Sequence, residues 1–238
     1  MKEKQQQWKQ DVKLDKRRTN YMKQNLTELV FILDRSGSMS NLVNDTIGGF
    51  NSMIEKNKKE DGECIVTTIL FDSEYEVLHD RINIDDIEPI TTKEYYARGT
   101  TALIDSMAKA INKTKNDLEN ACLKERAEKV LFVIITDGHE NASREFTSDT
   151  VKQLVEEQKK LGWDFIFLGA NIDSFSVANN LGVSSDRVMN YHADSRGTGV
   201  VWDAMENVTA KLRKSSVLSA DLDFSKEFDA LEDDFENR

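Results

Sequence analysis

Two segments of this sequence consist almost entirely of apolar residues, VLFVII at positions 130–135 and FIFLGA at positions 165–170. A strand with one solvated face alternates apolar and polar residues, whereas a strand covered by helices on both faces is apolar at every position. Short apolar runs alternate along the chain with longer segments of helical periodicity, the pattern of repeated β-α units. The sequence therefore predicts an α/β fold with a doubly wound, mostly parallel six-stranded sheet and helices on both faces.

One pair of strands is predicted to depart from the parallel arrangement. The segment YEVLHDRIN follows CIVTTILFD after only a few residues. A parallel crossover needs a dozen residues or more, so this connection is predicted to be a hairpin that adds one antiparallel edge strand. Strands are predicted at 29–33, 64–71, 75–80, 129–136, 163–169 and 187–190, and helices at 44–58, 102–118, 147–161, 173–181 and 199–214.

The chain length bounds the number of domains, since 238 residues suffice for one domain with a full core. That domain is predicted to span residues 26–214, between a basic polar tail at 1–25 and an acidic tail at 215–238. Apolar residues recur at helical spacing in the acidic tail, which predicts an amphipathic helix that either folds back on the domain or docks on a partner. These residues are Phe224, Phe228, Leu231 and Phe235.

Charge and hydropathy exclude several classes of protein. The net charge of −11 argues against nucleic-acid binding, which needs clustered Lys and Arg. No apolar run reaches membrane-spanning length, and no apolar stretch follows the basic N-terminus as in a secretory signal. We therefore expect a cytoplasmic protein in which Cys64 and Cys122 are reduced and structural.

The segment LVFILDRSGSMSN, residues 29–41, ends a predicted strand and then places Asp34, Ser36 and Ser38 at alternate positions. In a parallel sheet, ligands bind beyond the carboxyl ends of the strands. One carboxylate and two hydroxyls suit a hard cation such as Mg²⁺, which prefers oxygen ligands. Gly37 permits the tight backbone of such a loop. The loop is therefore a candidate part of a metal site.

Two other segments offer oxygens to the same edge of the sheet. Thr136 and Asp137 end the strand of KVLFVIITDGHEN, and Thr100 and Thr101 precede a predicted helix in ARGTTALIDSM. Each fragment alone is compatible with ordinary turn chemistry. Together, and in this order along the chain, the three segments predict a metal site.

This combination resembles the metal-ion-dependent adhesion site of von Willebrand factor type A domains, the fold shared with integrin inserted domains. That site has an Asp-x-Ser-x-Ser loop, a distant Thr and a distant Asp, which DRSGS, GTTALIDSM and TDG supply here over a resemblance of about residues 26–214. Thr101 has the family's spacing to Leu103 and Met107, while Thr100 remains an alternative. The resemblance implies these metal ligands: Asp34, Ser36, Ser38, Thr101 and Asp137.

The resemblance also implies a function. Asp34 and the two serines would bind Mg²⁺ directly, with Mn²⁺ or Ca²⁺ as alternative ions, while Thr101 and Asp137 exchange between direct and water-mediated contact. An ion with mostly neutral ligands retains positive charge, and in this family an Asp or Glu of a partner protein completes its coordination. We therefore expect a metal-dependent protein-binding module, not an enzyme, with no membrane partner.

Several phrases of the chain, among them TELVFILDRSGSMS and TDGHENASREFT, resemble small cytoplasmic bacterial or phage proteins of this family. That resemblance implies a role in intracellular assembly or stress-related signalling. The chain has no Walker motif, so an ATPase partner would be a separate protein.

Other interpretations of the same residues are a Mg²⁺-dependent phosphohydrolase and a structural domain with a vestigial metal site. Phosphatases on similar sheets carry Asp-x-Asp after the first strand, with the second Asp as general acid, and Ser36 occupies that position here. His139 is the only histidine near the predicted site. A dinucleotide-binding domain would need a Gly-rich turn that the first strand-helix junction lacks.

Overall fold

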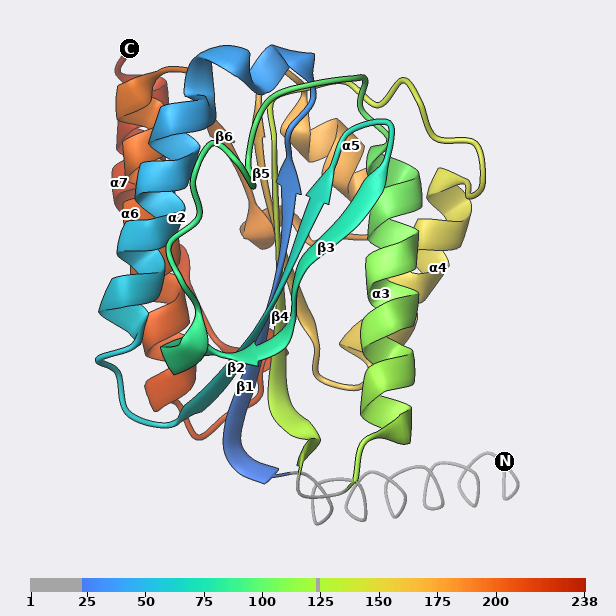
Figure 1. Cartoon of the computed structure of the whole chain (residues 1–238), viewed down its shortest axis with the longest axis vertical. Coiled ribbons are helices and arrows are strands. Elements are labelled where there is room, and N and C mark those ends of the chain that lie inside the picture. The colour runs from blue at the N-terminus through green and yellow to red at the C-terminus, as the bar shows by residue number, and fades with distance from the viewer. Residues whose placement is uncertain (1–22, 123–124) are drawn as a thin grey trace, which may run out of the picture.

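The computed structural model describes residues 23–122 and 125–238, which form a six-stranded sheet between two layers of helices (Figure 1). The strand order is β3-β2-β1-β4-β5-β6, and all neighbouring strands are parallel except β2 and β3. The predicted antiparallel edge strand is therefore confirmed. The strands are β1 (Lys23–Asp34), β2 (Glu63–Phe71), β3 (Tyr75–Asn83), β4 (Ala127–Thr136), β5 (Asp164–Ala170) and β6 (Val188–Tyr191).

Helices cover both faces of the sheet, which confirms the predicted double winding. On one face lie α2 (Val43–Asn57), α6 (Ser195–Lys214) and α7 (Ser225–Glu236). On the other lie α3 (Leu103–Asn120), α4 (Ser148–Lys159) and α5 (Ser174–Asn180). The short 3-10 helices are η1 (Gly37–Leu42), η2 (Ile84–Asp86), η4 (Ser185–Arg187) and η5 (Ser219–Asp221).

The central strands supply residues to two separate cores because their side chains point alternately to the two faces. Phe31 packs edge-on against Phe50 of α2, with ring centroids 5.7 Å apart, whereas Ile32 belongs to the core under α3 and α4. Strand β5 is buried along its whole length, as its uninterrupted apolar run predicted. Strand β1 begins at Lys23, so it extends into the segment that the sequence assigned to the N-terminal tail; residues 1–22 of that tail lie outside the described residues.

Helix α7 packs against α6 and β6, where Phe224, Phe228 and Leu231 are fully buried. Phe235 is 39% exposed and stacks on His192 with ring centroids 5.0 Å apart. Of the two alternatives for the amphipathic helix, the structure therefore shows the one in which it folds back on the domain.

The two cysteines are free thiols in different environments. Cys64 is buried in β2, but Cys122 is exposed after α3, so a structural role for Cys122 in the core is not supported.

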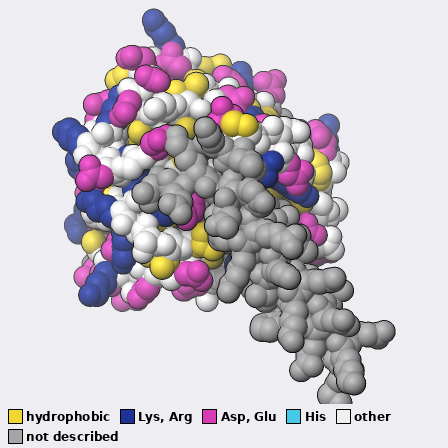
Figure 2. Space-filling model, turned by 90° about the horizontal axis from the view of Figure 1, so that it is seen from below, with side chains coloured by type: hydrophobic (Ala, Val, Ile, Leu, Met, Phe, Trp, Pro, Cys, Tyr) yellow, Lys and Arg dark blue, Asp and Glu magenta, His cyan; other side chains and the backbone are white. Residues whose placement is uncertain are grey.

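On the surface seen from below, basic and acidic side chains are interspersed (Figure 2). In the part of the chain that the structure describes, no helix has both the length and the apolarity to span a membrane.

Candidate metal centre

The five predicted ligands lie together at one edge of the sheet. Strands β1 and β4 are parallel neighbours with Leu33 opposite Ile135, so Asp34 and Thr136 end their strands side by side. Ser36 lies just before η1 and Ser38 in its first turn, Asp137 follows β4, and Thr101 lies just before α3. These five residues therefore lie at the carboxyl ends of the parallel strands, which is where ligands bind in proteins with an open parallel sheet.

Hydrogen bonds connect the first loop to the end of β4. Asp34 Oδ1 accepts a hydrogen bond from the Ser36 amide at 2.7 Å, and Asp34 Oδ2 accepts one from Thr136 Oγ1 at 2.6 Å. The hydroxyls of Ser36 and Ser38 are 3.0 Å apart, and Ser38 Oγ donates to Asp137 Oδ1 at 2.5 Å. Four of the predicted residues thus form one continuous polar cluster.

The side-chain oxygens of Thr101, Ser38 and Asp34 point toward one position beside Gly138. A Cβ atom at Gly138 would lie 2.8 Å from Thr101 Oγ1, 3.2 Å from Ser38 Oγ and 3.5 Å from Asp34 Oδ2. Three oxygens from two loops, the DRSGS loop and the loop that carries Thr101, therefore surround one point beside the backbone of the loop after β4, and only a glycine leaves that point free. Thr101 is 3% exposed and faces this point, while Thr100 is exposed on the wall of the same cavity. The geometry favours Thr101 over Thr100 as the site threonine.

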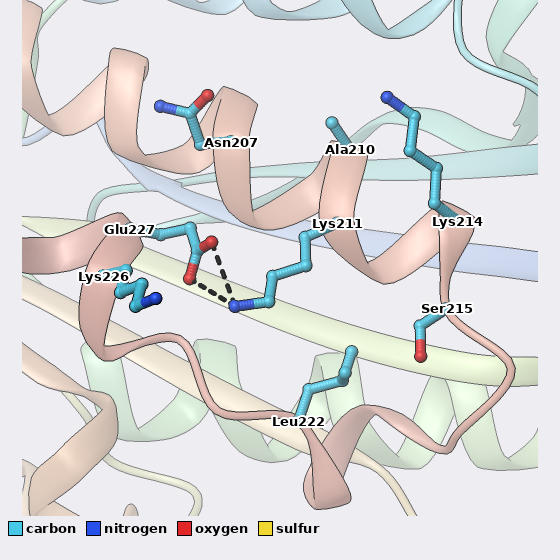
Figure 3. Close-up of a pocket in the computed structure, with 8 residues that line it drawn as sticks. All are labelled: Asn207, Ala210, Lys211, Lys214, Ser215, Leu222, Lys226 and Glu227. Atoms are coloured by element: carbon cyan, nitrogen blue, oxygen red, sulfur yellow. Dashed lines mark hydrogen bonds and ion pairs between the residues drawn. The ribbon is translucent and has the colours of Figure 1, made fainter.

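A cavity of about 390 Å³ opens over the cluster and is bordered by the exposed Gly37, Ser38, Thr100 and His139. A larger hollow of about 680 Å³, between α6 and the segment leading into α7, contains none of the predicted residues (Figure 3). Its Lys211 is already paired with Glu227, with an Nζ to Oε2 distance of 2.8 Å. The smaller cavity is therefore the candidate site.

Among the described residues, neither carboxyl group of the site forms an ion pair with Lys, Arg or His. Burial raises the pKa of Asp34 to about 6, against the hydrogen bonds from Thr136 and Ser36, which lower it. Burial also raises the pKa of Asp137. A bound cation would favour the ionised form of both groups.

The candidate ligand set contains few charged groups. Across the described ranges, 23–122 and 125–238, no three His, Cys, Asp or Glu residues lie close enough together to hold a metal ion. Hydroxyl groups would therefore have to supply the remaining oxygen ligands of a site for a hard divalent cation.

The loop after β4 is held to the start of α3 by two carboxylates that the sequence analysis did not identify. Asp105 accepts hydrogen bonds from the amides of Arg144, Glu145 and Phe146 at 2.8 to 3.2 Å, and these bonds, working against burial, hold its pKa below the ordinary value. Glu140 Oε2 accepts the Ile104 amide at 2.8 Å. These contacts fix Asp137 relative to Thr101.

A second set of missed residues lies behind the site. Arg35, inside the DRSGS loop, is fully buried, and its Nε donates to Asp72 Oδ2 at 2.9 Å. Tyr95 is fully buried and its hydroxyl donates to the Asp34 carbonyl. A signal for Arg35 was present in the sequence, because a charged residue directly after a buried strand needs a carboxylate nearby if its side chain turns inward.

No protein-family model and no curated protein sequence matches this chain. Solved structures do match at the level of fold. The von Willebrand factor domain of the type V pili tip protein Mfa5 from Porphyromonas gingivalis aligns with a TM-score of 0.55 and 10% identity, over 79% of this chain and 96% of that one. Manganese-loaded TRAP protein of Plasmodium vivax aligns with a TM-score of 0.51 and 16% identity, over 76% and 73%.

Proximal thread matrix protein 1 from the mussel byssus, in a structure with a zinc-occupied MIDAS motif, aligns with a TM-score of 0.52 and 12% identity. The alignment covers 77% of this chain and 46% of the mussel chain, so the present chain spans about half of that protein. These identities establish likeness of fold alone. With its strand order, its antiparallel edge strand and these structural matches, the chain has the fold of a von Willebrand factor type A domain.

Proposed function

We propose that the chain is a divalent-metal-dependent protein-binding module in which Mg²⁺ accepts a carboxylate from a partner. The observation that carries this proposal is the convergence at Gly138 of three oxygens from two loops, supplied by Thr101, Ser38 and Asp34. Two of these three oxygens are neutral hydroxyls. Solved structures of the same fold that contain manganese or zinc give independent support for a divalent ion.

The distribution of charge in the site explains why the ion would bind a partner. Asp34 Oδ2 is the carboxylate oxygen among the three atoms nearest the point of convergence, and Asp137 is connected to that point through Ser38, whose Oγ donates to Asp137 Oδ1. One carboxylate and several hydroxyls would leave a divalent ion with positive charge to share. The cavity is open beside the exposed Ser38 and Gly37, which gives an external carboxylate access.

Catalysis is a weaker fit to this arrangement. A phosphohydrolase of this layout would need an acid at the position of Ser36, and the Ser36 hydroxyl is instead hydrogen-bonded to Ser38. His139 lines the cavity, but its side chain is exposed and makes no hydrogen bond to either serine. We therefore propose binding, with hydrolysis of a generic phosphoester in the presence of Mg²⁺ or Mn²⁺ as the result that would favour an enzyme.

Thermal unfolding of the full chain in chelator, and then with increasing Mg²⁺, Mn²⁺ or Ca²⁺, tests the metal. A ligand at 100 times its Kd stabilises a protein by about 2.7 kcal/mol, which raises the Tm of a domain of this size by roughly 5 to 10 °C. Thr101→Ala and Thr100→Ala form a matched pair, since the Thr101 hydroxyl lies at the point of convergence beside Gly138, whereas Thr100 is exposed on the wall of the cavity. We expect a saturable rise in the wild type and in Thr100→Ala, and a reduced one in Thr101→Ala. No rise with any of the three ions in the wild type would refute the proposal.

A carboxylate probe tests the second half of the proposal. A short peptide with a single Asp should bind the metal-loaded chain, and binding should disappear in chelator and in Asp34→Ala. The same peptide with Asn in place of Asp is the control, because it has nearly the same shape without the charge. Equal binding of the two peptides would show that the ion does not accept a carboxylate.

A further inference from the structure

We propose that Asp72, Arg35 and Arg98 form a positioning cluster that holds Thr101 in place for the metal. This inference rests on the proposed function, because it assigns the three residues an effect on metal affinity. None of them faces the point of convergence at Gly138, so their effect on the ion would be exerted through the backbone that carries Thr101.

Asp72 connects three segments at the end of β2. Its Oδ2 accepts Arg35 Nε at 2.9 Å and Arg98 Nε at 2.8 Å, and its Oδ1 accepts the Glu74 amide at 2.7 Å. Its backbone carbonyl accepts the amide of Ala102 at 2.9 Å. The side chain is 1% exposed, and although burial opposes its ionisation, these hydrogen bonds hold its pKa below the ordinary value.

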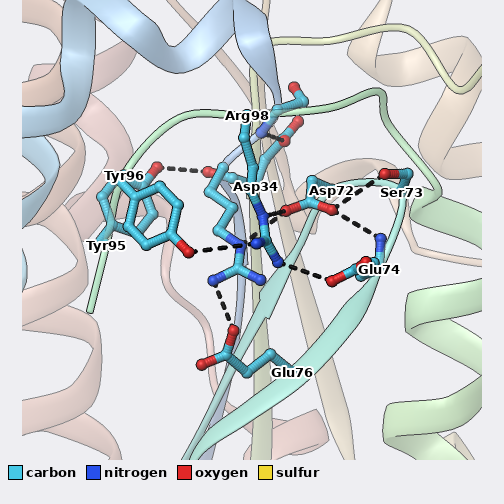
Figure 4. Close-up of polar contacts among 10 residues, drawn as sticks. Asp34, Asp72, Ser73, Glu74, Glu76, Tyr95, Tyr96 and Arg98 are labelled. Atoms are coloured by element: carbon cyan, nitrogen blue, oxygen red, sulfur yellow. Dashed lines mark hydrogen bonds and ion pairs between the residues drawn. The ribbon is translucent and has the colours of Figure 1, made fainter. Parts of the chain in front are cut away.

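The two arginines connect the DRSGS loop to the loop that carries Thr101. Arg35 immediately follows Asp34, and its carbonyl accepts the Arg98 amide at 2.7 Å. The Gly37 amide donates to the Gly99 carbonyl at 3.2 Å, one step further along both loops. The ring of Tyr96 lies near both guanidinium groups. Its centroid is 5.4 Å from the guanidinium carbon of Arg98 (Figure 4) and 5.7 Å from that of Arg35.

Thr101 lies between these attachment points. Arg98 is fixed on one side by Asp72 and by the Arg35 carbonyl, and Ala102 is fixed on the other by the Asp72 carbonyl. Thr101 has a further attachment, since its amide donates to Asn141 Oδ1 at 2.9 Å. Removing the Arg98 side chain would therefore loosen one end of a short segment whose Thr101 hydroxyl must stay beside Ser38 and Asp34. Groups that orient metal ligands in this way typically change metal affinity by 10- to 100-fold when they are mutated.

The choice of variant follows from burial. Asp72→Asn would leave the fully buried Arg35 with a weakened counterion, so it is expected to destabilise the whole fold. Arg98 is 37% exposed, and Arg98→Met keeps the Arg35 pair with Asp72 intact. Glu74→Gln is the matched control, because it removes the charge of the exposed partner of Arg98, at 2.9 Å, and leaves the side chain of Asp72 unchanged.

A double-mutant cycle distinguishes positioning from a general loss of stability. The Mg²⁺ or Mn²⁺ Kd of the full chain is measured by calorimetry for the wild type, Arg98→Met, Thr101→Ala and the double variant. We expect Arg98→Met to raise the Kd at least tenfold in the wild-type background and less than twofold in the Thr101→Ala background, with Glu74→Gln within twofold of the wild type. In chelator, hydrogen exchange of the Arg98 and Ala102 amides should accelerate in Arg98→Met.

The outcomes separate this inference from the proposed function. If the wild type binds metal and Arg98→Met weakens it equally in both backgrounds, or not at all, the positioning role is refuted while the metal site stands. If the wild type binds neither ion, the proposed function is wrong and the positioning role is refuted with it.

Discussion

The carboxyl group of Asp34 makes the metal-free site a source of instability that one substitution should relieve. The group is fully buried, and burial raises its pKa from an ordinary 3.8 to about 6. Between these values the folded chain keeps a proton that the unfolded chain has lost, so the stability of the wild type falls as the pH rises through this range. A shift of this size corresponds to about 3 kcal/mol at pH above 6, at 1.36 kcal/mol per pKa unit.

Asp34→Asn removes this pH dependence and keeps the local hydrogen bonds. An amide oxygen can accept the Ser36 amide as Asp34 Oδ1 does, and an amide nitrogen can donate to Thr136 Oγ1 after the hydroxyl rotates toward the Gly138 carbonyl, 3.4 Å away. In chelator we expect the advantage of the variant over the wild type to grow by about 2 kcal/mol between pH 4.5 and pH 7.5, or roughly 4 to 8 °C in Tm. With saturating Mg²⁺ the order should reverse, because only the wild type binds the ion.

Thermal and urea unfolding at both pH values, with chelator or with Mg²⁺, measures these four stabilities. Asp61→Asn is a control for loss of a carboxylate elsewhere, since Asp61 is exposed in the loop before β2. If Asp34→Asn in chelator is less stable than the wild type at pH 7.5, or if its advantage is the same at both pH values, then burial of an unpaired charge is not what dominates at this position.

Three further predictions follow from other parts of the structure. Gly138→Ala would place a Cβ 2.8 Å from Thr101 Oγ1, so we expect at least a tenfold loss of Mg²⁺ affinity in calorimetry with a nearly unchanged circular dichroism spectrum. Burial raises the pKa of Glu28, in β1, to about 7, against the attraction of Arg81, so the stability of the wild type should fall as the pH rises from 4.5 through 7. Urea unfolding at pH 4.5 and 8 should therefore show Glu28→Gln gaining about 3 kcal/mol relative to the wild type across this range. Phe228→Ala should cost about 3 to 5 kcal/mol by urea unfolding, because Phe228 is fully buried in the core under α7; a loss below about 1 kcal/mol would mean that α7 is not held there in solution.

Much of the fold could be predicted because its determinants are local. The apolar runs of β4 and β5 indicated strands covered on both faces, and the short connection between β2 and β3 indicated a hairpin. The start of β1 was missed by six residues, since Thr27 and Glu28 are polar yet buried and so interrupt the apolar pattern on which the prediction depended. The family's spacing pointed to Thr101 with Thr100 as an alternative, and in the structure it is the Thr101 hydroxyl that lies beside Ser38 and Asp34.

The candidate ligands were visible in the sequence because each occupies a fixed place after a strand or before a helix, where its residue type is informative without knowledge of its neighbours. The positioning cluster was not, because Arg35 and Asp72 are 37 residues apart and nothing local distinguishes Asp72 from an ordinary turn residue. The burial of Phe224 and Phe228 was likewise undetermined, since an apolar stripe can pack on its own domain or on a partner. The sequence determined which residues stand at the ends of elements, whereas the parallel register of β1 with β2 and β4 decided which of them meet, because contacts between distant segments depend on how the whole sheet closes.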